Sequence, residues 1–398
     1  MTLQQWLTHL SKGGGYLVFT ISLSVSCAQP EPAATALSTE MASVQEKEKG
    51  GSEVTGHYEV DLDWPQLIHP DWTSGRTGGV WAASPDRIFV VQTGELPILE
   101  GPRSRGGIPI RNAVDHPETR TTEHRFLIYD RAGNLIESWE QHNHLFVHPH
   151  SVKMSPYDPD HVWVVDGRSE SGICAEQVWK FTMDGQLVMT LGEHGVPGND
   201  ETHFAGPTDL AFLPNGDFYV ADGYKNGRIV RFNEDGEYLN AFGTRGREPG
   251  QFTQVHGIAV DLEGRIYTAD RGNSRIQVFD PDGTLLDIWP NIPFPMDLAV
   301  TNDGHVWVAE GRVNKFLKFN LDGHLLYAWG TFGAEPGHVW GTHRFSVDSE
   351  GNLYTAEVWG GRAQRFRPKP GADPEKLIDS FLGFPSLLSR VKNFETAP

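Results

Sequence analysis

The sequence predicts an all-β fold with the architecture of a six-bladed β-propeller. Three observations carry this prediction: a strand–turn–strand unit occurs six times, a third and a fourth strand follow most copies, and no stretch of useful length has helical periodicity. Four antiparallel strands repeated every roughly 40–58 residues are typical of propeller blades. The 398 residues suffice for one large domain of this kind.

Each copy of the unit has a first strand, a tight polar turn with Gly or Asp, and a second strand rich in aromatic and β-branched residues. "VHGIAVDLEGRIYTAD" is the clearest copy, and the second strand ends on an acidic residue in five of the six copies. The residues that open and close the copies are Gly78 and Gln92, His150 and Asp166, Thr208 and Asp222, His256 and Asp270, Met296 and Glu310, and His343 and Glu357.

The third and fourth strands follow in segments such as "SRIQVFDPDG" and "TLLDIWP". The sixth copy has no evident fourth strand after "GRAQRFRP", and either His57–Trp64 or Lys376–Phe381 could supply it and close the ring. A seventh blade would have to be hidden in Gly94–His124. We interpret that segment instead as a long loop that joins the second and third strands of the first blade and covers one face of the disc.

Composition and the first residues predict an exported protein without a nucleic-acid partner. The net charge of −19 would repel phosphate. Lys12 precedes "GYLVFTISLSVS", an apolar stretch too short to span a bilayer, so residues 1–27 are a predicted signal peptide. "LSVSC" resembles a bacterial lipoprotein cleavage site, which makes Cys27 a candidate for lipidation and membrane attachment; an ordinary signal peptide cut near Ala28 is the alternative. We expect a location in the periplasm or cell envelope.

The remaining boundaries follow from composition. Residues 28–55 are polar and lack bulky apolar side chains, so they predict a flexible linker. Residues 56–385 form the predicted propeller and residues 386–398 a C-terminal tail. Cys174 is the only cysteine besides Cys27, so no internal disulfide is expected in the mature chain.

The first residue of each copy faces the central axis, because the first strand of a propeller blade is the innermost. These six axial residues are Gly78, His150, Thr208, His256, Met296 and His343. Histidine therefore occupies every other blade. Three converging imidazoles with an open fourth position are a pattern of catalytic zinc sites, so the sequence predicts a zinc centre on the axis. Three unrelated histidines bonded to backbone carbonyls are the alternative, and His148 is expected at the rim rather than as a fourth ligand.

Several motifs resemble one family. They are "LDWP" at Leu62–Pro65, "HPHSV" around His150, "PTDLAF" with "ADGYKNGRIVRF" between Pro207 and Phe232, "GQFTQVHGIAV" and "ADRGNSRIQVF". Over roughly Tyr58 to Pro368 the chain resembles peptidyl-α-hydroxyglycine α-amidating lyase, a zinc propeller that completes peptide C-terminal amidation. Strands like "NGRIVRF" alone are less specific, because NHL-repeat propellers share them.

The resemblance implies a zinc-dependent lyase that cleaves a C–N bond of a small-molecule or peptide substrate of the carbinolamide type. It implies that His150, His256 and His343 bind Zn²⁺, that Tyr224 is the general base, and that Arg271 holds the substrate beside the metal. The alternative from another class is a non-catalytic NHL-repeat propeller that binds protein or glycan at the cell envelope. A calcium-dependent lactonase-like propeller ranks last, because it needs carboxylate and amide ligands on the axis.

Two positions depart from the family. A blade-1 arginine that contacts the substrate carboxylate falls on Thr93. An aspartate that binds a structural Ca²⁺, together with carbonyls matching Val80 and Val152, falls on Arg344. We therefore expect the calcium to be absent and the guanidinium to take its place.

Other arginines are candidates for the missing carboxylate contact. Arg312 and Arg168 follow the second strands of their blades, so both are predicted to bind substrate, and Arg344 is a third candidate. The loop of the first blade adds Arg103, Arg105 and Arg111.

Overall fold

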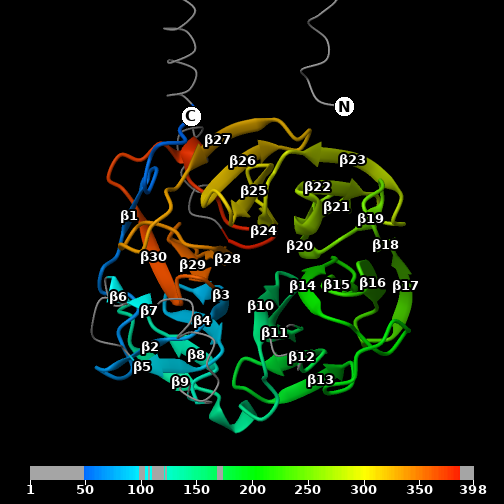
Figure 1. The fold of residues 1–398 in the computed structure, drawn as a ribbon, viewed down its shortest axis with the longest axis horizontal. Helices are drawn as coiled ribbons and strands as arrows, with labels where there is room; N and C mark the ends of the chain where they lie inside the picture. The colour runs from blue at the N-terminus through cyan, green and yellow to red at the C-terminus, as the bar shows by residue number, and fades with distance from the viewer. Residues whose placement is uncertain are drawn as a thin grey trace, which may run out of the picture. The chain divides into compact units, whose positions relative to one another are not determined.

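The computed structural model describes residues 49–97, 121, 123–167 and 174–385, and the backbone alone of residues 104–105 and 108–109 (Figure 1). The predicted signal peptide with Cys27, the tail 386–398, Arg168, Arg103 and Arg111 lie outside the described residues. No helix within the described ranges is long and apolar enough to cross a membrane.

Six four-stranded antiparallel sheets surround a central channel, as predicted (Figure 1). Blade 1 consists of β3 (Thr77–Ser84), β4 (Arg87–Gln92), β8 (Phe126–Tyr129) and β9 (Leu135–Ser138). Blade 2 consists of β10 (Pro149–Ser155), β11 (Asp158–Asp166), β12 (Gln177–Thr182) and β13 (Leu187–Leu191). Blade 3 consists of β14 (Pro207–Phe212), β15 (Phe218–Asp222), β16 (Arg228–Phe232) and β17 (Tyr238–Phe242).

Blade 4 consists of β20 (Val255–Val260), β21 (Ile266–Asp270), β22 (Arg275–Phe279) and β23 (Leu285–Pro290). Blade 5 consists of β24 (Pro295–Val300), β25 (His305–Glu310), β26 (Lys315–Asn320) and β27 (Leu325–Trp329). Blade 6 consists of β28 (Thr342–Val347), β29 (Leu353–Glu357), β30 (Arg362–Pro368) and β1 (Tyr58–Val60). The first strand of blades 1 to 5, and β28 in blade 6, is the innermost (Figure 1).

The ring closes through β1, which settles the two closures that the sequence left open. β1 pairs with β30 in antiparallel register, with Tyr58 opposite Pro368 and Val60 opposite Phe366. The fourth strand of the last blade thus comes from the N-terminal side, so the two ends of the propeller hold one sheet together.

The other candidate for closure, Lys376–Phe381, has a different place. A 3₁₀ turn, η3 (Pro374–Lys376), is followed by a segment that runs from blade 5 towards blade 1. Leu382 donates its N–H to the Val300 carbonyl, and the Phe381 ring packs on Trp81 with the ring centroids 5.6 Å apart. This segment joins no blade sheet and instead covers one end of the channel.

The predicted linker ends earlier than residue 55. Residues 49–55 lie along β27: Ala328 donates to the Lys49 carbonyl, Gly330 donates to the Glu53 carbonyl, and the Tyr327 hydroxyl donates to the Glu53 carboxylate at 2.6 Å. Backbone pairing of this kind orders the chain, so the propeller body begins before the predicted boundary.

The core lies between neighbouring blades. Blades 2 and 3, for example, share a cluster with Trp163, Val165, Leu210 and Val220, all at most 3% exposed. Each such large side chain contributes about 1.5–3 kcal/mol when fully buried. The blades therefore hold each other in a rigid ring, which fixes whatever the innermost strands present to the axis.

An insertion in blade 1 stands where a seventh blade would have to be. After β4, the short strand β5 (Glu95–Pro97) pairs with β2 (Trp72–Ser74), and β6 (Ser104–Arg105) pairs with β7 (Ile108–Pro109). These are two-stranded pieces, and the described chain returns to blade 1 at β8.

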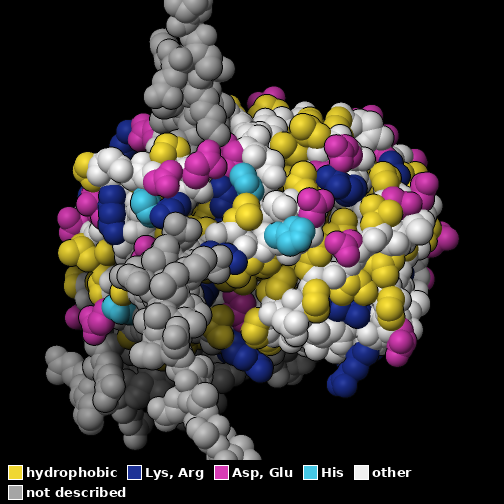
Figure 2. Space-filling model, turned by 90° about the horizontal axis from the view of Figure 1, so that it is seen from above, with side chains coloured by type: hydrophobic (Ala, Val, Ile, Leu, Met, Phe, Trp, Pro, Cys, Tyr) yellow, Lys and Arg dark blue, Asp and Glu magenta, His cyan; other side chains and the backbone are white. Residues whose placement is uncertain are grey.

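On the face seen in Figure 2, acidic and basic side chains are interspersed with apolar ones.

Candidate metal centre

All six axial residues occupy the same unusual position in their blades. In blade 4 the register between β20 and β21 runs from Val255 opposite Asp270 to Gly257 opposite Ala269, so His256 is an extra residue in a β-bulge. The same shift occurs at the axial residue of the other five blades, at Gly78, His150, Thr208, Met296 and His343. A bulge redirects a side chain. Here it accompanies every residue that the repeat places on the axis.

The acidic residues at the ends of the second strands hold the chain that leads into these bulges. The carboxylate of Asp270 accepts the N–H of Thr253, and that of Glu357 accepts the N–H of Trp340, each three residues before an axial histidine. Asp166 and Asp222 accept the N–H groups at the equivalent positions, Val147 and Ala205. These acids therefore position the axial residues and are not themselves ligands.

The three axial histidines converge as predicted. One ring nitrogen from each of His150, His256 and His343 lies within 4.8 Å of the others, and all three side chains are buried. The ring centroids are 4.7 Å apart for His150 and His256, 4.4 Å for His150 and His343, and 4.7 Å for His256 and His343. Alternate blades thus bring three imidazoles to one point.

Each Nδ1 contacts a backbone carbonyl of the axial residue in the next blade. The distances are 2.7 Å from His150 to Thr208, 2.6 Å from His256 to Met296, and 2.6 Å from His343 to Gly78. A carbonyl only accepts, so each Nδ1 carries the hydrogen and Nε2 keeps its lone pair. The three rings therefore present Nε2 atoms in the form that a metal ligand needs.

Electrostatics favour the neutral rings. Burial first, and then the neighbouring His343 and Arg344, lower the pKa of His150 well below its usual value. Burial, the Arg271 guanidinium and the other two rings do the same to the pKa of His256. Burial and Arg344 lower the pKa of His343. Neutral imidazoles can bind a cation without first losing a proton.

Tyr224 and Arg271 lie at this centre, where the resemblance predicts them. The Tyr224 hydroxyl lies 2.9 Å from Nε2 of His150 and 3.0 Å from Nε2 of His256. The Arg271 guanidinium carbon lies 5.3 Å from the centroid of the Tyr224 ring and 4.8 Å from that of Phe294. The phenol is therefore held against the ligand atoms, with a cation beside its ring.

A cavity of about 200 Å³ opens on the side of the histidines where Tyr224 and Arg271 lie. His150, His343, Tyr224 and Arg271 contribute to its wall, together with His148, which is 8% exposed. The cavity suits a small polar ligand that carries negative charge, because its wall contains two arginine side chains.

The second of these arginines, Arg76, is the residue that the sequence analysis missed. Its side chain is 6% exposed and lines the cavity. Its backbone N–H donates to the Thr93 hydroxyl at 3.1 Å, and the N–H of Thr93 donates back to its carbonyl at 3.0 Å. Thr93 thus holds the connection between β2 and β3, which carries an arginine. The sequence signal was weak, because Arg76 precedes the first strand of its blade instead of following the second.

Arg344 does not line this cavity, which corrects its predicted role in substrate binding. Its guanidinium lies on the Nδ1 side of the rings, where it donates to the carbonyls of Thr208 and His256, both at 2.8 Å, and of Met296 and His343, both at 2.9 Å. The side chain is 2% exposed. As predicted, backbone carbonyls surround the guanidinium, although they are not those of Val80 and Val152.

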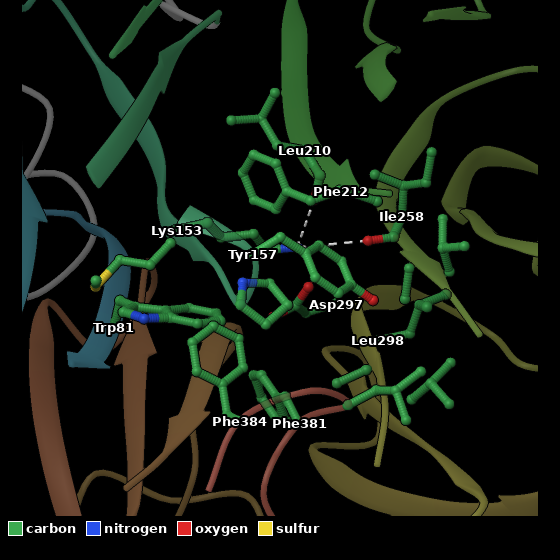
Figure 3. A pocket seen from close by; sticks show the side chains of 18 residues that line it. Trp81, Lys153, Tyr157, Leu210, Phe212, Ile258, Asp297, Leu298, Phe381 and Phe384 are labelled. Atoms are coloured by element: carbon green, nitrogen blue, oxygen red, sulfur yellow. Dashed lines mark hydrogen bonds between the residues drawn. The ribbon is translucent and has the colours of Figure 1, made fainter. Parts of the chain in front are cut away.

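On the side of Arg344 that faces away from the histidine rings, here called the lower end, the channel holds a buried network of charges. Lys153 donates to Asp209 at 2.7 Å and to the Leu210 carbonyl at 3.1 Å, and Asp297 lies 3.7 Å from the Arg344 guanidinium. Figure 3 shows Lys153 and Asp297 above the aromatic rings of the C-terminal segment. The lower end of the channel is therefore covered by apolar side chains, and the cavity beside the histidines lies on the other side of Arg344.

The remaining predicted substrate contacts are less central. Arg312 is exposed, and its guanidinium carbon lies 5.4 Å from the Phe294 centroid, beside Arg271 at the cavity rim. Arg168 lies outside the described residues, and only the backbone of Arg105 is described.

The fold and the repeats together define the class of protein. The NHL repeat family matches residues 204–232 and 252–279, which are parts of blades 3 and 4. The protein is a six-bladed β-propeller with NHL repeats.

Its relatives include proteins named as lyases. The chain is 29% identical over 257 residues to NHL repeat-containing protein 3 of Homo sapiens, covering 62% of this chain and 65% of that protein. It is 28% identical over 295 residues to peptidyl-alpha-hydroxyglycine alpha-amidating lyase 1 of Drosophila melanogaster, covering 67% of this chain and 52% of that protein. The chain thus spans less than two thirds of the length of either relative.

Among solved structures, that of a streptogramin B lyase has a TM-score of 0.50 at 13% identity, covering 80% of this chain and 100% of that one. At this identity the likeness concerns the fold alone.

Proposed function

We propose that the protein is a zinc-dependent lyase that cleaves the C–N bond of a carbinolamide with an adjacent carboxylate, such as an N-acyl-α-hydroxyglycine. The observation that carries this proposal is the convergence of His150, His256 and His343, with Tyr224 against two of their Nε2 atoms. The relatives named as amidating lyases support the reaction class.

The donor set fits zinc. Zinc in catalytic sites takes three protein ligands and one open position, and three histidines are a known set. Here carbonyls fix the tautomer of all three rings, and burial keeps them neutral. When bound, zinc would supply a Lewis acid that polarises the substrate hydroxyl.

Arg76 and Arg271 would bind the substrate carboxylate. Both line the cavity, and both are at most 6% exposed, so their charges act in a region of low dielectric. A guanidinium binds a carboxylate through two parallel hydrogen bonds, which orients it. A substrate held in this way would lie with its hydroxyl towards the histidines and Tyr224.

Tyr224 would move the proton. As the phenolate, Tyr224 would take the proton of the substrate hydroxyl, the hydroxyl carbon and oxygen would form a C=O bond, and the C–N bond would break with its electrons going to nitrogen. The same proton would then pass to the nitrogen. The products would be a primary amide and glyoxylate, with no other reactant consumed.

The test combines metal analysis and product release. Untagged wild type and His256→Ala are compared for zinc content and for glyoxylate released from an N-acyl-α-hydroxyglycine. We expect the variant to hold one zinc fewer and to release no glyoxylate above background. Equal zinc in both proteins would contradict the metal site, whereas a zinc difference without any glyoxylate from wild type would exclude this substrate.

The second candidate is a non-catalytic propeller that binds protein or glycan. Arg344 in the place of the family's calcium-binding aspartate, and Thr93 in the place of its arginine, favour this alternative. It predicts that the three axial histidines hold no metal and that no α-hydroxyglycine compound is turned over.

A further inference from the structure

A second cluster of histidines and a carboxylate lies away from the channel, at the insertion of blade 1. His69, Glu95 and His124 each offer a ligand atom, and these atoms lie within 4.8 Å of one another. The three residues come from the segment before β2, from β5 and from the segment before β8. They are far apart in the sequence and no repeat relates them.

Both imidazoles approach the same carboxylate oxygen. Nδ1 of His69 lies 3.1 Å from Oε2 of Glu95, and Nδ1 of His124 lies 2.9 Å from it. Three ligand atoms that share one zinc at about 2.0–2.1 Å lie roughly 3.3 Å apart in a tetrahedral site. The two nitrogen–oxygen distances are therefore a few tenths of an ångström from those of a metal site.

The surroundings of His124 add two further observations. Its other ring nitrogen, Nε2, lies 3.3 Å from the Glu140 carboxylate, and a carboxylate behind the ring is the usual partner of a metal-bound histidine. Its backbone has a φ of 55°, in the left-handed region that costs a residue with a side chain free energy. Such strain persists where the surroundings hold the residue in place.

The carboxylate itself is almost fully buried. The Glu95 side chain is 4% exposed, whereas that of His69 is 49% exposed and that of His124 is 11% exposed. A buried carboxylate needs a compensating positive charge. A divalent cation bound from the open side of His69 would supply it.

We propose that His69, Glu95 and His124 form a second, structural zinc site, with water as the fourth ligand. Two histidines and a glutamate are a known zinc donor set. The site would hold together the two ends of the insertion, since Glu95 also exchanges hydrogen bonds with Thr121 at 3.0 and 3.2 Å.

The site would also fix the connection after β2 that carries Arg76. Glu95 is opposite Ser74 in the β2–β5 pair, and Gly75 donates to the Gly94 carbonyl at 2.7 Å. Arg76 is the next residue, so a metal at Glu95 would restrain the cavity wall without touching substrate.

The experiment counts metal in untagged full-length wild type and variants, after removal of metal, loading with ZnCl₂ alone and dialysis. We expect two zinc ions per chain in wild type, one in His69→Ala, one in His256→Ala and none in the double variant. His144→Ala, which removes another exposed histidine, is the matched control and should keep two. Loading with Co²⁺ gives the same counts through visible absorption, with a different spectrum for each site.

The proposal is overturned if His69→Ala holds as much metal as wild type, or if His256→Ala holds none. Glu95→Gln keeps the side-chain shape and should lose the same ion as His69→Ala. In the His256→Ala background, added zinc should raise the melting temperature, and in the double variant it should not. If only the His69→Ala loss is seen, this site stands and the axial zinc of the proposed function fails.

Discussion

His343 and Arg344 are consecutive residues of β28, yet the Arg344 guanidinium lies on the opposite side of the three imidazole rings from the cavity that His343 lines. The His343 ring is part of the cavity wall, with its Nδ1 hydrogen on the Gly78 carbonyl, whereas the Arg344 guanidinium lies on the other side of the rings. The carbonyls of Thr208 and Met296 accept hydrogen bonds from both Arg344 and a histidine Nδ1. Arg344 thus braces the groups that orient two of the three candidate ligands.

Arg344→Leu should therefore destabilise the protein strongly. It leaves four buried carbonyls without this donor and removes the cation beside Asp209 and Asp297, and breaking a buried charge network costs about 3–5 kcal/mol. Urea unfolding measures the loss. Arg344→Lys keeps the charge but cannot reach four carbonyls, so its free energy of unfolding should lie between those of wild type and Arg344→Leu. An Arg344→Leu protein as stable as wild type would contradict the bracing role.

Calcium should matter only when Arg344 is absent. The guanidinium fills the position between the carbonyls, so neither EGTA nor CaCl₂ should change the melting temperature of wild type. Arg344→Asp removes the cation and adds a carboxylate to the same carbonyls, which are hard oxygen ligands. We expect CaCl₂ to raise the melting temperature of this variant. A calcium response in wild type would show that the cation site lies elsewhere.

Tyr224→Phe tests the proton transfer. The phenyl ring keeps the packing under Arg271, while the oxygen between His150 and His256 is lost. We expect kcat for glyoxylate release to fall about 10²–10⁴-fold, the usual contribution of a general base, with zinc content unchanged. Tyr238→Phe, on the outer strand β17, is the control, and equal activity of both variants would remove Tyr224 from the mechanism.

Arg76→Ala tests the replacement of the family's arginine. Losing a charged hydrogen-bond partner costs roughly 1.5–3 kcal/mol, so kcat/KM for an N-acyl-α-hydroxyglycine should fall about 10–100-fold. Arg76→Lys should recover part of the lost kcat/KM. For a carbinolamide without the carboxylate, kcat/KM should be nearly the same in Arg76→Ala and wild type. Arg247→Ala, at an exposed position, is the control. A uniform loss on both substrates would indicate a structural role instead.

Closure of the ring by β1 gives a stability prediction. Tyr58 is fully buried, and its hydroxyl accepts the N–H of Ile378 at 2.9 Å. Tyr58→Phe loses this acceptor and should cost about 1–3 kcal/mol. Tyr58→Ala also leaves a cavity at the seam and should cost about 3–5 kcal/mol. Denaturant unfolding compares the two, and similar values would mean that the seam contributes little through packing.

The buried carboxylate of Asp297 should make stability depend on pH. Burial raises its pKa from 3.8 to about 6. Between these values the folded state holds a proton that the unfolded state has lost, so the free energy of unfolding falls as pH rises. Asp297→Asn removes this dependence, so the free energy of unfolding of the variant should rise relative to that of wild type from pH 4 to pH 6. Parallel profiles of the two proteins would show that Asp297 is not the group responsible.

Much of the architecture could be read from the sequence because it is local. The alternation of apolar residues, the Gly and Asp turns and the spacing of fourteen residues lie within single hairpins. Repetition then sets the histidines of alternate copies on one axis, since equivalent residues of equivalent blades face the same way. The sequence therefore predicts His150, His256 and His343 on the axis.

What the sequence alone could not decide depends on contacts between distant segments. Tyr58 and Pro368 meet across the seam although more than 300 residues separate them, and Arg76 reaches the cavity from outside its repeat. The bulges and the place of Arg344 also follow from the closed ring, because only there do carbonyls of several blades surround one guanidinium. The sequence by itself determined the blades and the three axial histidines. The tertiary structure decided what orients those histidines and which arginines line the cavity beside them, because both depend on the distances between segments that are far apart in the sequence.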